Sequence, residues 1–517
     1  MTFEIVFVLL CLLGMVAALV ADKMRPGMIL FSVVVLFLCA GILTPKEMLE
    51  GFSNKGMITV ALLFLVSEGI RQSGTLGQVI KKLLPQGKTT VFKAQLRILP
   101  SVAFISAFLN NTPVVVIFAP IIKHWAKSVS LPATKFLIPL SYVTILGGIC
   151  TLIGTSTNLV VHGMILEAGF EGFSMFELGK VGIFIAIAGI IYIFLFSKRL
   201  LPDARPDTAV PDEEVEEGGR LHRVEAVLGA RFPGINKKLK DFNFQRHYGA
   251  EVKEIKTRSG QRFVSNLEDV VLHEGDTLVV MADDTFIPTW GESSVFVLLT
   301  NGNEPDITGK KKRWLALLLL VLMIVGATVG ELPVTKEMFP DIKLDMFFFV
   351  SITTIIMAWT NLFPARKYTK YISWDILITI ACAFAISKAM VNSGVADSVA
   401  RFIIGLSDDY GPHVLLAMLF IITNLFTELI TNNAAAALAF PLALSIASQL
   451  GVSPTPFFVV ICMAASASFS TPIGYQTNLI VQGIGNYKFT DFVRIGLPLN
   501  IITFLISIIL IPLIWNF

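Results

Sequence analysis

The chain has 517 residues, of which 54% are hydrophobic and only 15% are charged, and its net charge is +3. Its mean hydropathy is +0.73. Soluble domains carry charge on about a quarter of their residues, so this composition excludes an ordinary soluble protein. The net charge says little about partners, and no nucleic-acid partner is expected. Repeated apolar runs long enough to cross a bilayer predict an all-α polytopic membrane protein.

Residues 1–199 form the first predicted membrane repeat. Its five expected spans are 3–20, 27–43, 56–73, 135–168 and 176–198, and the fourth is interrupted near 151–157. An amphipathic segment over 75–86 is expected at the membrane interface. Apolar arms at 94–109 and 113–128 have about 16 residues each, fewer than a crossing helix needs. We therefore expect a re-entrant hairpin with Asn110-Asn111-Thr112 at its tip.

Residues 310–517 repeat this order as a second membrane repeat. Its expected spans are 313–330, 343–361, 374–391, 454–484 and 491–515, and its hairpin over 413–450 has Thr431-Asn432-Asn433 at the tip. An odd number of crossings makes the second repeat inverted relative to the first. The expected fold class is two inverted repeats of five spans, each with a re-entrant hairpin and a broken helix, plus one small cytoplasmic α+β domain.

Basic residues predict the orientation, because cytoplasmic loops carry an excess of Lys and Arg. With the N-terminus outside, the inner side receives most of them, including Lys81, Lys82, Lys123, Lys127, Lys198, Arg199 and the run from Lys310 to Arg313. We expect both termini outside the plasma membrane, taken to be a bacterial inner membrane. Residues 200–309 are then cytoplasmic.

Residues 200–309 are polar and separate the two repeats. They contain an acidic run at 212–217, interpreted as a solvated linker, and a helix candidate at Asn236–Phe242. Alternating segments predict strands at Val224–Leu228, Glu251–Thr257, Thr277–Met281 and Val295–Leu299. This stretch is predicted to be a small soluble α+β domain.

Polar, helix-breaking motifs recur at matching places in the two repeats. Each tip triplet is followed by a second motif, Gly154-Thr155-Ser156-Thr157 in one repeat and Gly474-Tyr475-Gln476-Thr477 in the other. Broken backbone at membrane depth persists only where protein or a cavity satisfies it, so paired breaks indicate a transporter binding site. Helices restarting near Pro113, Ala434, Thr157 and Thr477 would bring four N-termini together, and such ends attract anions.

The four motifs contain no Lys or Arg, so a divalent anion would be held by helix ends, amides and hydroxyls. The predicted anion ligands are Asn111, Thr112, Thr155, Thr157, Asn432, Asn433, Tyr475 and Thr477. Unwound carbonyls and uncharged oxygens of the same loops suit Na⁺, the expected coupling ion. The predicted Na⁺ ligands are Ser106, Asn110, Asn111 and Gly154 in the first repeat, and Thr427, Thr431, Asn432 and Gly474 in the second.

Three charged residues in or near the spans need a separate interpretation. Glu68 and Lys388 occupy matching positions, and an interfacial role is favoured for both over a functional one. Glu428 precedes the second tip and is expected to orient it or to bind a proton or cation. The plain alternative for the Asn and Thr residues of the motifs is helix capping, which their fourfold recurrence disfavours. No nucleophile–base set is visible, so an enzyme is not expected.

The motifs resemble those of the divalent anion–sodium symporter family, which carries sulfate and di- and tricarboxylates. That family has Ser-Asn-Thr at each hairpin tip and a Thr-Pro-hydrophobic-Gly-Thr turn after it; the turns here are Thr151-Leu152-Ile153-Gly154-Thr155 and Thr471-Pro472-Ile473-Gly474-Tyr475. The resemblance implies Na⁺-coupled uptake, a homodimer and elevator-type alternating access within membrane lipid. Asn110, Thr431, Asn433, Tyr475 and Gln476 depart from the family pattern, which argues against a dicarboxylate.

The insert is similar to an RCK C-terminal domain of the TrkA-C type, on the residues 234–239 and 272–280. This similarity implies that the insert regulates or dimerises and binds an unknown small ligand. Family members with such inserts resemble carriers of sulfate and other inorganic anions, so sulfate is the favoured substrate. The alternatives are Na⁺-coupled or exchange transport of dicarboxylates such as succinate, an ion channel gated by the insert, and an anion sensor. H⁺ coupling stays open beside Na⁺.

Overall fold

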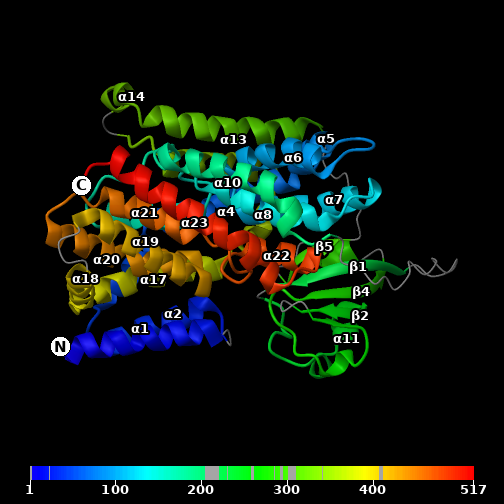
Figure 1. Cartoon of the computed structure of the whole chain (residues 1–517), viewed down its shortest axis with the longest axis horizontal. Coiled ribbons are helices and arrows are strands. Elements are labelled where there is room, and N and C mark those ends of the chain that lie inside the picture. The colour runs from blue at the N-terminus through cyan, green and yellow to red at the C-terminus, as the bar shows by residue number, and fades with distance from the viewer. Residues whose placement is uncertain are drawn as a thin grey trace.

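The structure is a computed structural model that describes residues 3–21, 24–203, 221–229, 231–257, 261–283, 286–290, 295–300, 310–339, 342–406 and 411–517. The acidic run at 212–217 lies outside these residues. Within them, long helices make up most of the molecule and one small antiparallel sheet lies at one end (Figure 1).

The first half is helical from α1 to α10. Its helices are α1 (Phe3–Ala21), α2 (Pro26–Cys39), α3 (Pro45–Glu50), α4 (Lys55–Gln72), α5 (Thr75–Leu83), α6 (Val91–Ser106), α7 (Asn111–Ser128), α8 (Leu137–Gly148), α9 (Ser156–Glu167) and α10 (Gly179–Leu200), with short 3₁₀ turns at Gly51–Ser53 and Ala133–Lys135.

The second half follows the sheet. Its helices are α13 (Lys310–Gly330), α14 (Pro333–Met338), α15 (Met346–Trp359), α16 (Tyr368–Tyr371), α17 (Trp374–Asn392), α18 (Val395–Leu406), α19 (Gly411–Leu429), α20 (Asn432–Leu450), α21 (Thr455–Ser466), α22 (Gln476–Gly485) and α23 (Phe489–Ile514), with a 3₁₀ turn at Ala365–Lys367.

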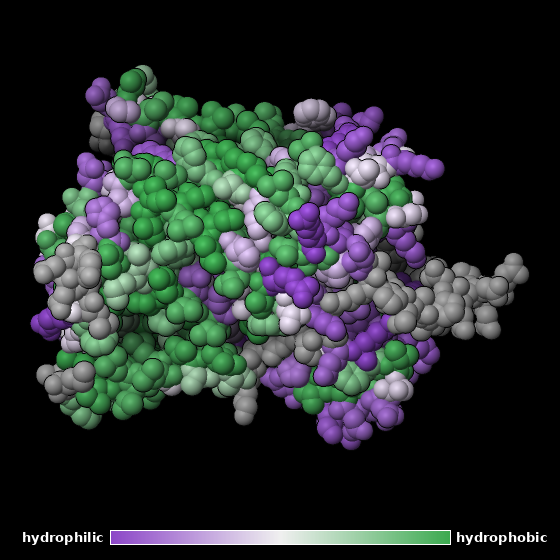
Figure 2. All heavy atoms as spheres, in the orientation of Figure 1, coloured by the Kyte–Doolittle hydropathy of each residue, from purple (hydrophilic) through white to green (hydrophobic). Residues whose placement is uncertain are grey.

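Eight helical stretches of the described chain are long and apolar enough to cross a membrane. The spans expected at 27–43 and 343–361 correspond to the shorter apolar helices α2 and α15, of 14 residues each. Apolar side chains cover the helical part, whereas hydrophilic side chains gather over the sheet end (Figure 2). These features confirm the prediction of an all-α polytopic membrane protein that carries a small sheet.

The two halves contain matching helices that make matching contacts. The pair α2–α17 corresponds to α15–α4, the pair α6–α8 to α19–α21, and the pair α7–α22 to α20–α9, while α10 packs on its own counterpart α23. Each half contributes a hairpin (α6–α7 and α19–α20) and an interrupted helix (α8–α9 and α21–α22). The sequence analysis predicted the amphipathic helix α5 but missed its counterpart α18, which also follows a Ser-Gly pair with glycine in the left-handed conformation.

The sheet has the strand order β3-β2-β4-β1-β5, and all its pairings are antiparallel. Its strands are β1 (Leu221–Leu228), β2 (Glu251–Lys256), β3 (Arg262–Phe263), β4 (Thr277–Asp283) and β5 (Phe296–Thr300), so the four predicted strands are confirmed. The helix predicted over Asn236–Phe242 is wrong. Leu239–Asp241 is a single 3₁₀ turn, and α11 (Phe244–Tyr248) begins only where the Asn243 side chain accepts from the Arg246 N–H at 3.0 Å. Further short elements are a 3₁₀ turn at Leu267–Asp269 and α12 (Phe286–Trp290).

The chain ends and the sheet lie at opposite ends of the helical part (Figure 1). The last turn of α7 is at the sheet end, because Lys123 of that helix forms a salt bridge with Glu225 of β1. The first turn of α7, at Asn111, therefore points into the middle of the molecule. This places the hairpin tip well inside the helical part.

Candidate functional site

Each hairpin turns on a short polar loop. Residues 107–110 join α6 to α7, and residues 430–431 join α19 to α20. The second arms begin at Asn111 and Asn432, two residues earlier than the predicted starts at Pro113 and Ala434. The Asn residues predicted to bind the anion are thus the first residues of their helices.

The two broken helices are also present. The chain leaves helix between Gly148 and Ser156 in the first half, and between Ser466 and Gln476 in the second. Two asparagines that the sequence analysis did not assign hold these loops. Asn158 donates to the Thr151 carbonyl at 2.9 Å, and Asn478 donates to the Ser468 carbonyl at 2.8 Å. Their repeated position after each turn was the available signal.

The four helix N-termini meet in pairs across the two halves. At one junction, Asn111 Nδ2 donates to the Tyr475 hydroxyl at 2.6 Å, and that hydroxyl lies 3.1 Å from Thr155 Oγ1. At the other, Asn433 Oδ1 accepts from the Thr157 hydroxyl at 3.3 Å. The Tyr475 hydroxyl also contacts the Asn432 side chain, so it joins both hairpin tips.

Helix capping does not explain the polar residues at these ends. The N-cap residues of α7, α9, α20 and α22 are Asn110, Thr155, Thr431 and Tyr475, and none makes a side-chain cap hydrogen bond. Helices whose first N–H groups lack side-chain caps retain donors and a positive partial charge for a ligand. The side-chain bonds of these residues within the described chain involve no Arg or Lys. The arrangement suits an anion held without a formal positive charge.

A cluster of uncharged oxygens lies behind the first tip. Ser106 Oγ donates to Asn111 Oδ1 at 2.8 Å, and the backbone of Gly148 and Gly154 approaches closely on the other side. A Cβ built on Gly148 would lie 2.7 Å from Asn111 Oδ1, and one built on Gly154 would lie 2.5 Å from the Gly148 carbonyl oxygen. Gly148 was not among the predicted ligands. Hydroxyl, amide and carbonyl oxygens are the ligand types that hard monovalent cations take in broken helices.

The second tip repeats this cluster. Thr427 Oγ1 lies 2.9 Å from Asn432 Oδ1 and 2.6 Å from the Ala465 carbonyl oxygen. A Cβ built on Gly474 would lie 2.0 Å from Ser468 Oγ and 2.4 Å from the Thr427 carbonyl oxygen. The structure therefore brings together Thr427, Asn432 and Gly474 as the sequence analysis expected, and it adds Ser468.

The amino-acid sequence is similar to those of known transporters. A family model described as a citrate transporter matches residues 16–448 and also residues 337–516. The chain belongs to this citrate transporter family. An uncharacterized transporter of Synechocystis is 30% identical over 94% of this chain and 93% of its own length. An uncharacterized transporter of Escherichia coli is 25% identical over the full length of both chains. Sodium/sulfate cotransporter 2 of Chlamydomonas reinhardtii is 31% identical over 56% of this chain and 33% of its own length.

Some of the predicted ligands in this member of the citrate transporter family lie away from the place where the four helix N-termini meet. The Thr477 hydroxyl accepts from Ser141 at 2.8 Å, which turns it towards α8, and Thr112 makes only a 3.4 Å contact with Gln476 at an exposed edge. Thr431 Oγ1 is buried and has no hydrogen-bond partner in the described part of the chain. Asn110, the N-cap of α7, lines a pocket.

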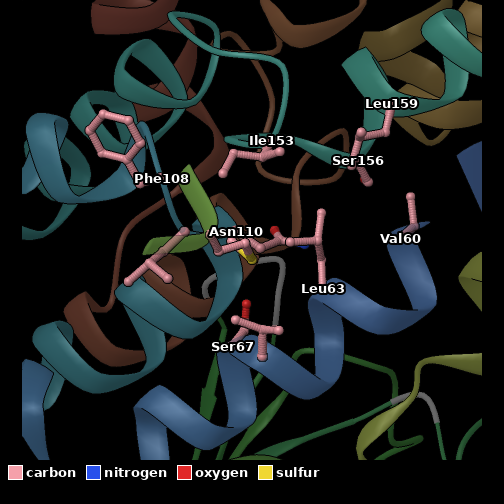
Figure 3. A pocket seen from close by; sticks show the side chains of 11 residues that line it. Val60, Leu63, Ser67, Phe108, Asn110, Ile153, Ser156 and Leu159 are labelled. Atoms are coloured by element: carbon pink, nitrogen blue, oxygen red, sulfur yellow. The ribbon is translucent and has the colours of Figure 1, made fainter. Parts of the chain in front are cut away.

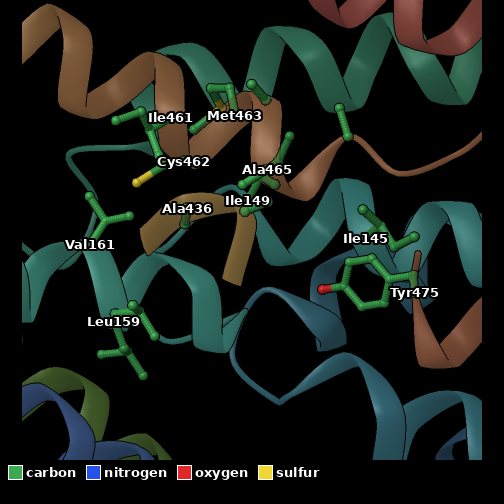
Figure 4. Packing of buried hydrophobic residues seen from close by; sticks show 14 of the residues in the cluster. Ile145, Ile149, Leu159, Val161, Ala436, Ile461, Cys462, Met463, Ala465 and Tyr475 are labelled. Carbon is green, nitrogen blue, oxygen red and sulfur yellow. The ribbon is translucent and has the colours of Figure 1, made fainter. Parts of the chain in front are cut away.

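This pocket opens beside the first hairpin tip (Figure 3). Val60, Leu63 and Ser67 of α4 form one wall, and Phe108 and Asn110 of the tip form another. Its described lining is mostly apolar and contains no charged side chain, so we assign no ligand to it. The Tyr475 ring belongs to the buried apolar core and lies beside Ile145 (Figure 4).

The structure shows where two of the charged residues lie. Glu68 forms a salt bridge of 2.6 Å with Arg71, one turn further along α4, and also accepts from Gln72. Lys388 is exposed on α17. Neither forms a hydrogen bond or salt bridge to a hairpin tip within the described residues, and the interfacial role favoured for both stays a prediction.

Proposed function

We propose that this chain is a secondary transporter that couples Na⁺ entry to the uptake of a small divalent anion, with sulfate as the favoured substrate. The observation that carries the proposal is the meeting of four helix N-termini without side-chain caps around Asn111, Asn432 and Tyr475. A dianion that leaves water needs such donors, and bound Na⁺ ions supply the positive charge that the site's own side chains lack.

Two features support Na⁺ as the coupling ion. The oxygen clusters around Asn111 and Asn432 match in chemistry and position, as expected for one cation in each half. A relative that covers part of this chain is named as a sodium/sulfate cotransporter. Two Na⁺ would balance the charge of one divalent anion.

Sulfate is favoured over a carboxylate because of Tyr475. Its hydroxyl already bonds to Asn111 and contacts Thr155, so the phenol fills space that a longer di- or tricarboxylate would need. A carboxylate is the second candidate, because the matching family model is described as a citrate transporter.

Alternating access is supported by an asymmetry between otherwise matching helices. Helix α17 packs along α20, whereas its counterpart α4 barely touches α7 and packs on α9 instead. The hairpin helix α20 thus packs on α17, whereas the matching hairpin helix α7 does not pack on α4 in the same way. We propose an elevator-type movement that exchanges these two arrangements, in a homodimer with both termini outside and residues 200–309 in the cytoplasm as an RCK C-terminal-like domain.

The test is uptake of radiolabelled sulfate into liposomes that contain the purified chain, with and without an inward Na⁺ gradient. We expect uptake that requires Na⁺, competes with excess unlabelled sulfate and shows counterflow, which a channel does not. Asn111→Ala and Asn432→Ala should each lower uptake roughly tenfold or more, because a hydrogen bond to a charged group contributes about 1.5–3 kcal/mol.

Asn361→Gly is the matched control. Asn361 is an exposed loop residue in the left-handed conformation, where glycine fits, so uptake should stay unchanged. Stronger inhibition by succinate or citrate than by sulfate would favour the carboxylate alternative. Uptake that is indifferent to Na⁺ would contradict the proposed coupling.

A further inference from the structure

A half-buried carboxylate, with one fully buried oxygen, lies beside the second proposed cation cluster. Glu428, on α19, follows Thr427 directly, and its Oε1 accepts from the Ser470 N–H at 2.9 Å and from Asn500 Nδ2 at 2.7 Å. Its other oxygen, Oε2, is buried and has no hydrogen-bond partner among the described residues. Asn500, on α23, is 6% exposed, and its Oδ1 is also buried without a partner there.

The surroundings of Glu428 leave its charge unbalanced. Within the described residues, no Lys, Arg or His lies within salt-bridge distance of it, and the groups that bond to it, the Ser470 N–H, the Asn500 amide and Thr471, are all uncharged. An ionised carboxylate inside a membrane protein is costly unless a positive charge or a proton accompanies it. The two unpartnered oxygens, Oε2 of this carboxylate and Oδ1 of the neighbouring Asn500, are hard ligands that point to a cation.

This arrangement belongs to one half only. By the register of the repeats, Glu428, Ser470 and Asn500 correspond to Ala107, Cys150 and Ala186. The register is supported by matching bonds, since Thr151 Oγ1 donates to the Ala107 carbonyl just as Thr471 Oγ1 donates to the Glu428 carbonyl. The first half therefore forms the same turn without any of these polar side chains, so the turn itself does not require a carboxylate.

We infer that Glu428 and Asn500 bind a further Na⁺ through Glu428 Oε2 and Asn500 Oδ1, separately from the clusters at Asn111 and Asn432. The inference rests on the proposed function and adds one coupling ion to it. The further ion balances the carboxylate, as the other two ions balance the divalent anion. The loaded site is then neutral, whereas the empty site keeps the negative charge of Glu428.

This charge balance has a consequence for transport. The loaded form crosses the membrane without moving net charge, and the empty form returns outward with one negative charge. A membrane potential that is negative inside favours this return, so each cycle carries one net positive charge inward. Uptake is expected to accelerate when a K⁺ diffusion potential makes the liposome interior negative.

Glu428→Gln tests the inference without disturbing the turn, because the glutamine Oε1 can still accept from Ser470 and Asn500. We expect Na⁺-dependent sulfate uptake to persist, with one Na⁺ fewer entering per sulfate in parallel ²²Na⁺ and ³⁵S-sulfate uptake. We also expect its dependence on membrane potential to be lost. Glu167→Gln is the control, since Glu167 bonds to Asn54 at the far end of α9 and should leave both readouts unchanged.

Asn500→Ala is a second variant for the case that Glu428→Gln does not fold. It should keep sulfate uptake but raise the Na⁺ concentration for half-maximal uptake several-fold. A folded Glu428→Gln protein with the wild-type Na⁺ ratio and voltage dependence would overturn the inference. Absence of Na⁺-dependent uptake in the wild type would instead refute the proposed function.

Discussion

At the scale of single residues, the hydroxyl of Tyr475 occupies the point where the two hairpin tips meet. It accepts from Asn111, lies 3.1 Å from Thr155 Oγ1 and contacts Asn432. An anion at this point would draw on the same donors, and a phenol hydroxyl can turn to donate as well. The ring behind it is packed among apolar side chains and cannot move aside freely. Tyr475 thus affects both which hydrogen-bond donors are available between the two hairpin tips and how much space a ligand would have there.

Replacing Tyr475 separates these two effects. Tyr475→Phe removes one donor and should weaken sulfate uptake by roughly threefold to tenfold, because a net hydrogen bond contributes about 0.5–1.5 kcal/mol. Tyr475→Thr introduces the residue that stands at the matching position, Thr155, and also opens space. We expect succinate and citrate to inhibit uptake by Tyr475→Thr but not by Tyr475→Phe. Equal inhibition of both variants would show that the ring does not set the size of the substrate.

At the scale of elements, the loops between α8 and α9 and between α21 and α22 bring backbone into close contact with the hairpin tips. Gly474 faces Thr427 and Ser468 at distances that leave no room for a side chain, and Gly154 faces Gly148 in the same way. These close backbone contacts are possible only because a Cβ is missing there. In the proposed function, the two interrupted helices would contribute carbonyl oxygens to the cation sites beside the hairpin side chains.

Adding a methyl group to this loop tests its role. Gly474→Ala would place a Cβ 2.0 Å from Ser468 Oγ and 2.4 Å from the Thr427 carbonyl oxygen, so the loop must move away from the tip. We expect the Na⁺ concentration for half-maximal sulfate uptake to rise at least tenfold. Gly14→Ala is the control, because nothing lies within 4 Å of a Cβ at that position of α1. An unchanged Na⁺ requirement in a folded Gly474→Ala protein would place the cation elsewhere.

The elements were largely predictable from the sequence, whereas the contacts between them were not. Apolar runs and the repeated Asn-containing motifs indicate the spans, hairpins and helix breaks, because lipid leaves a chain few alternatives to helix. Helix α18 was missed, since its 12 residues are too short and too polar to resemble a span. Gly148 and Ser468 carry no local signal, because their importance comes from a partner that lies in another helix. Thr477 was predicted to bind the anion, but its partner Ser141 could only be found from the packing.

At the scale of the whole molecule, the sheet holds two of the four helices whose N-termini form the site. Lys123, near the far end of α7, lies 2.9 Å from Glu225 of β1. Gly275 and Thr277 pack against Leu479 and Gly483 of α22. Any movement of α7 and α22 between two arrangements must therefore either carry the sheet along or break these contacts. The sheet is therefore connected directly to two of the helices that carry the proposed binding centre.

Glu225 is ionised at neutral pH and pairs with Lys123 at 2.9 Å. Burial by itself would raise the pKa of Glu225, but the ammonium groups of Lys123 and Lys256 lower it to about 2. A carboxyl whose pKa is lower in the folded state stabilises the fold at pH values above its unfolded pKa. This stabilisation is lost as the pH falls from 4.5, the ordinary pKa of a glutamate side chain, towards 2. The ion pair between Lys123 and Glu225 therefore joins α7 to the sheet throughout the physiological pH range.

A double-mutant cycle on Lys123 and Glu225 measures the strength of this tether. Lys123→Met and Glu225→Gln should each lower the melting temperature in detergent, and the double variant should lose less than the sum. We expect a coupling energy of about 1–3 kcal/mol at pH 7 that disappears when the pH is lowered towards 2. The exposed pair Lys253–Glu251, 2.6 Å apart on the same sheet, is the control, because exposed ion pairs contribute little. Additive effects of Lys123→Met and Glu225→Gln would mean that the sheet is held to the helices by the packing of Gly275 and Thr277 on α22 instead.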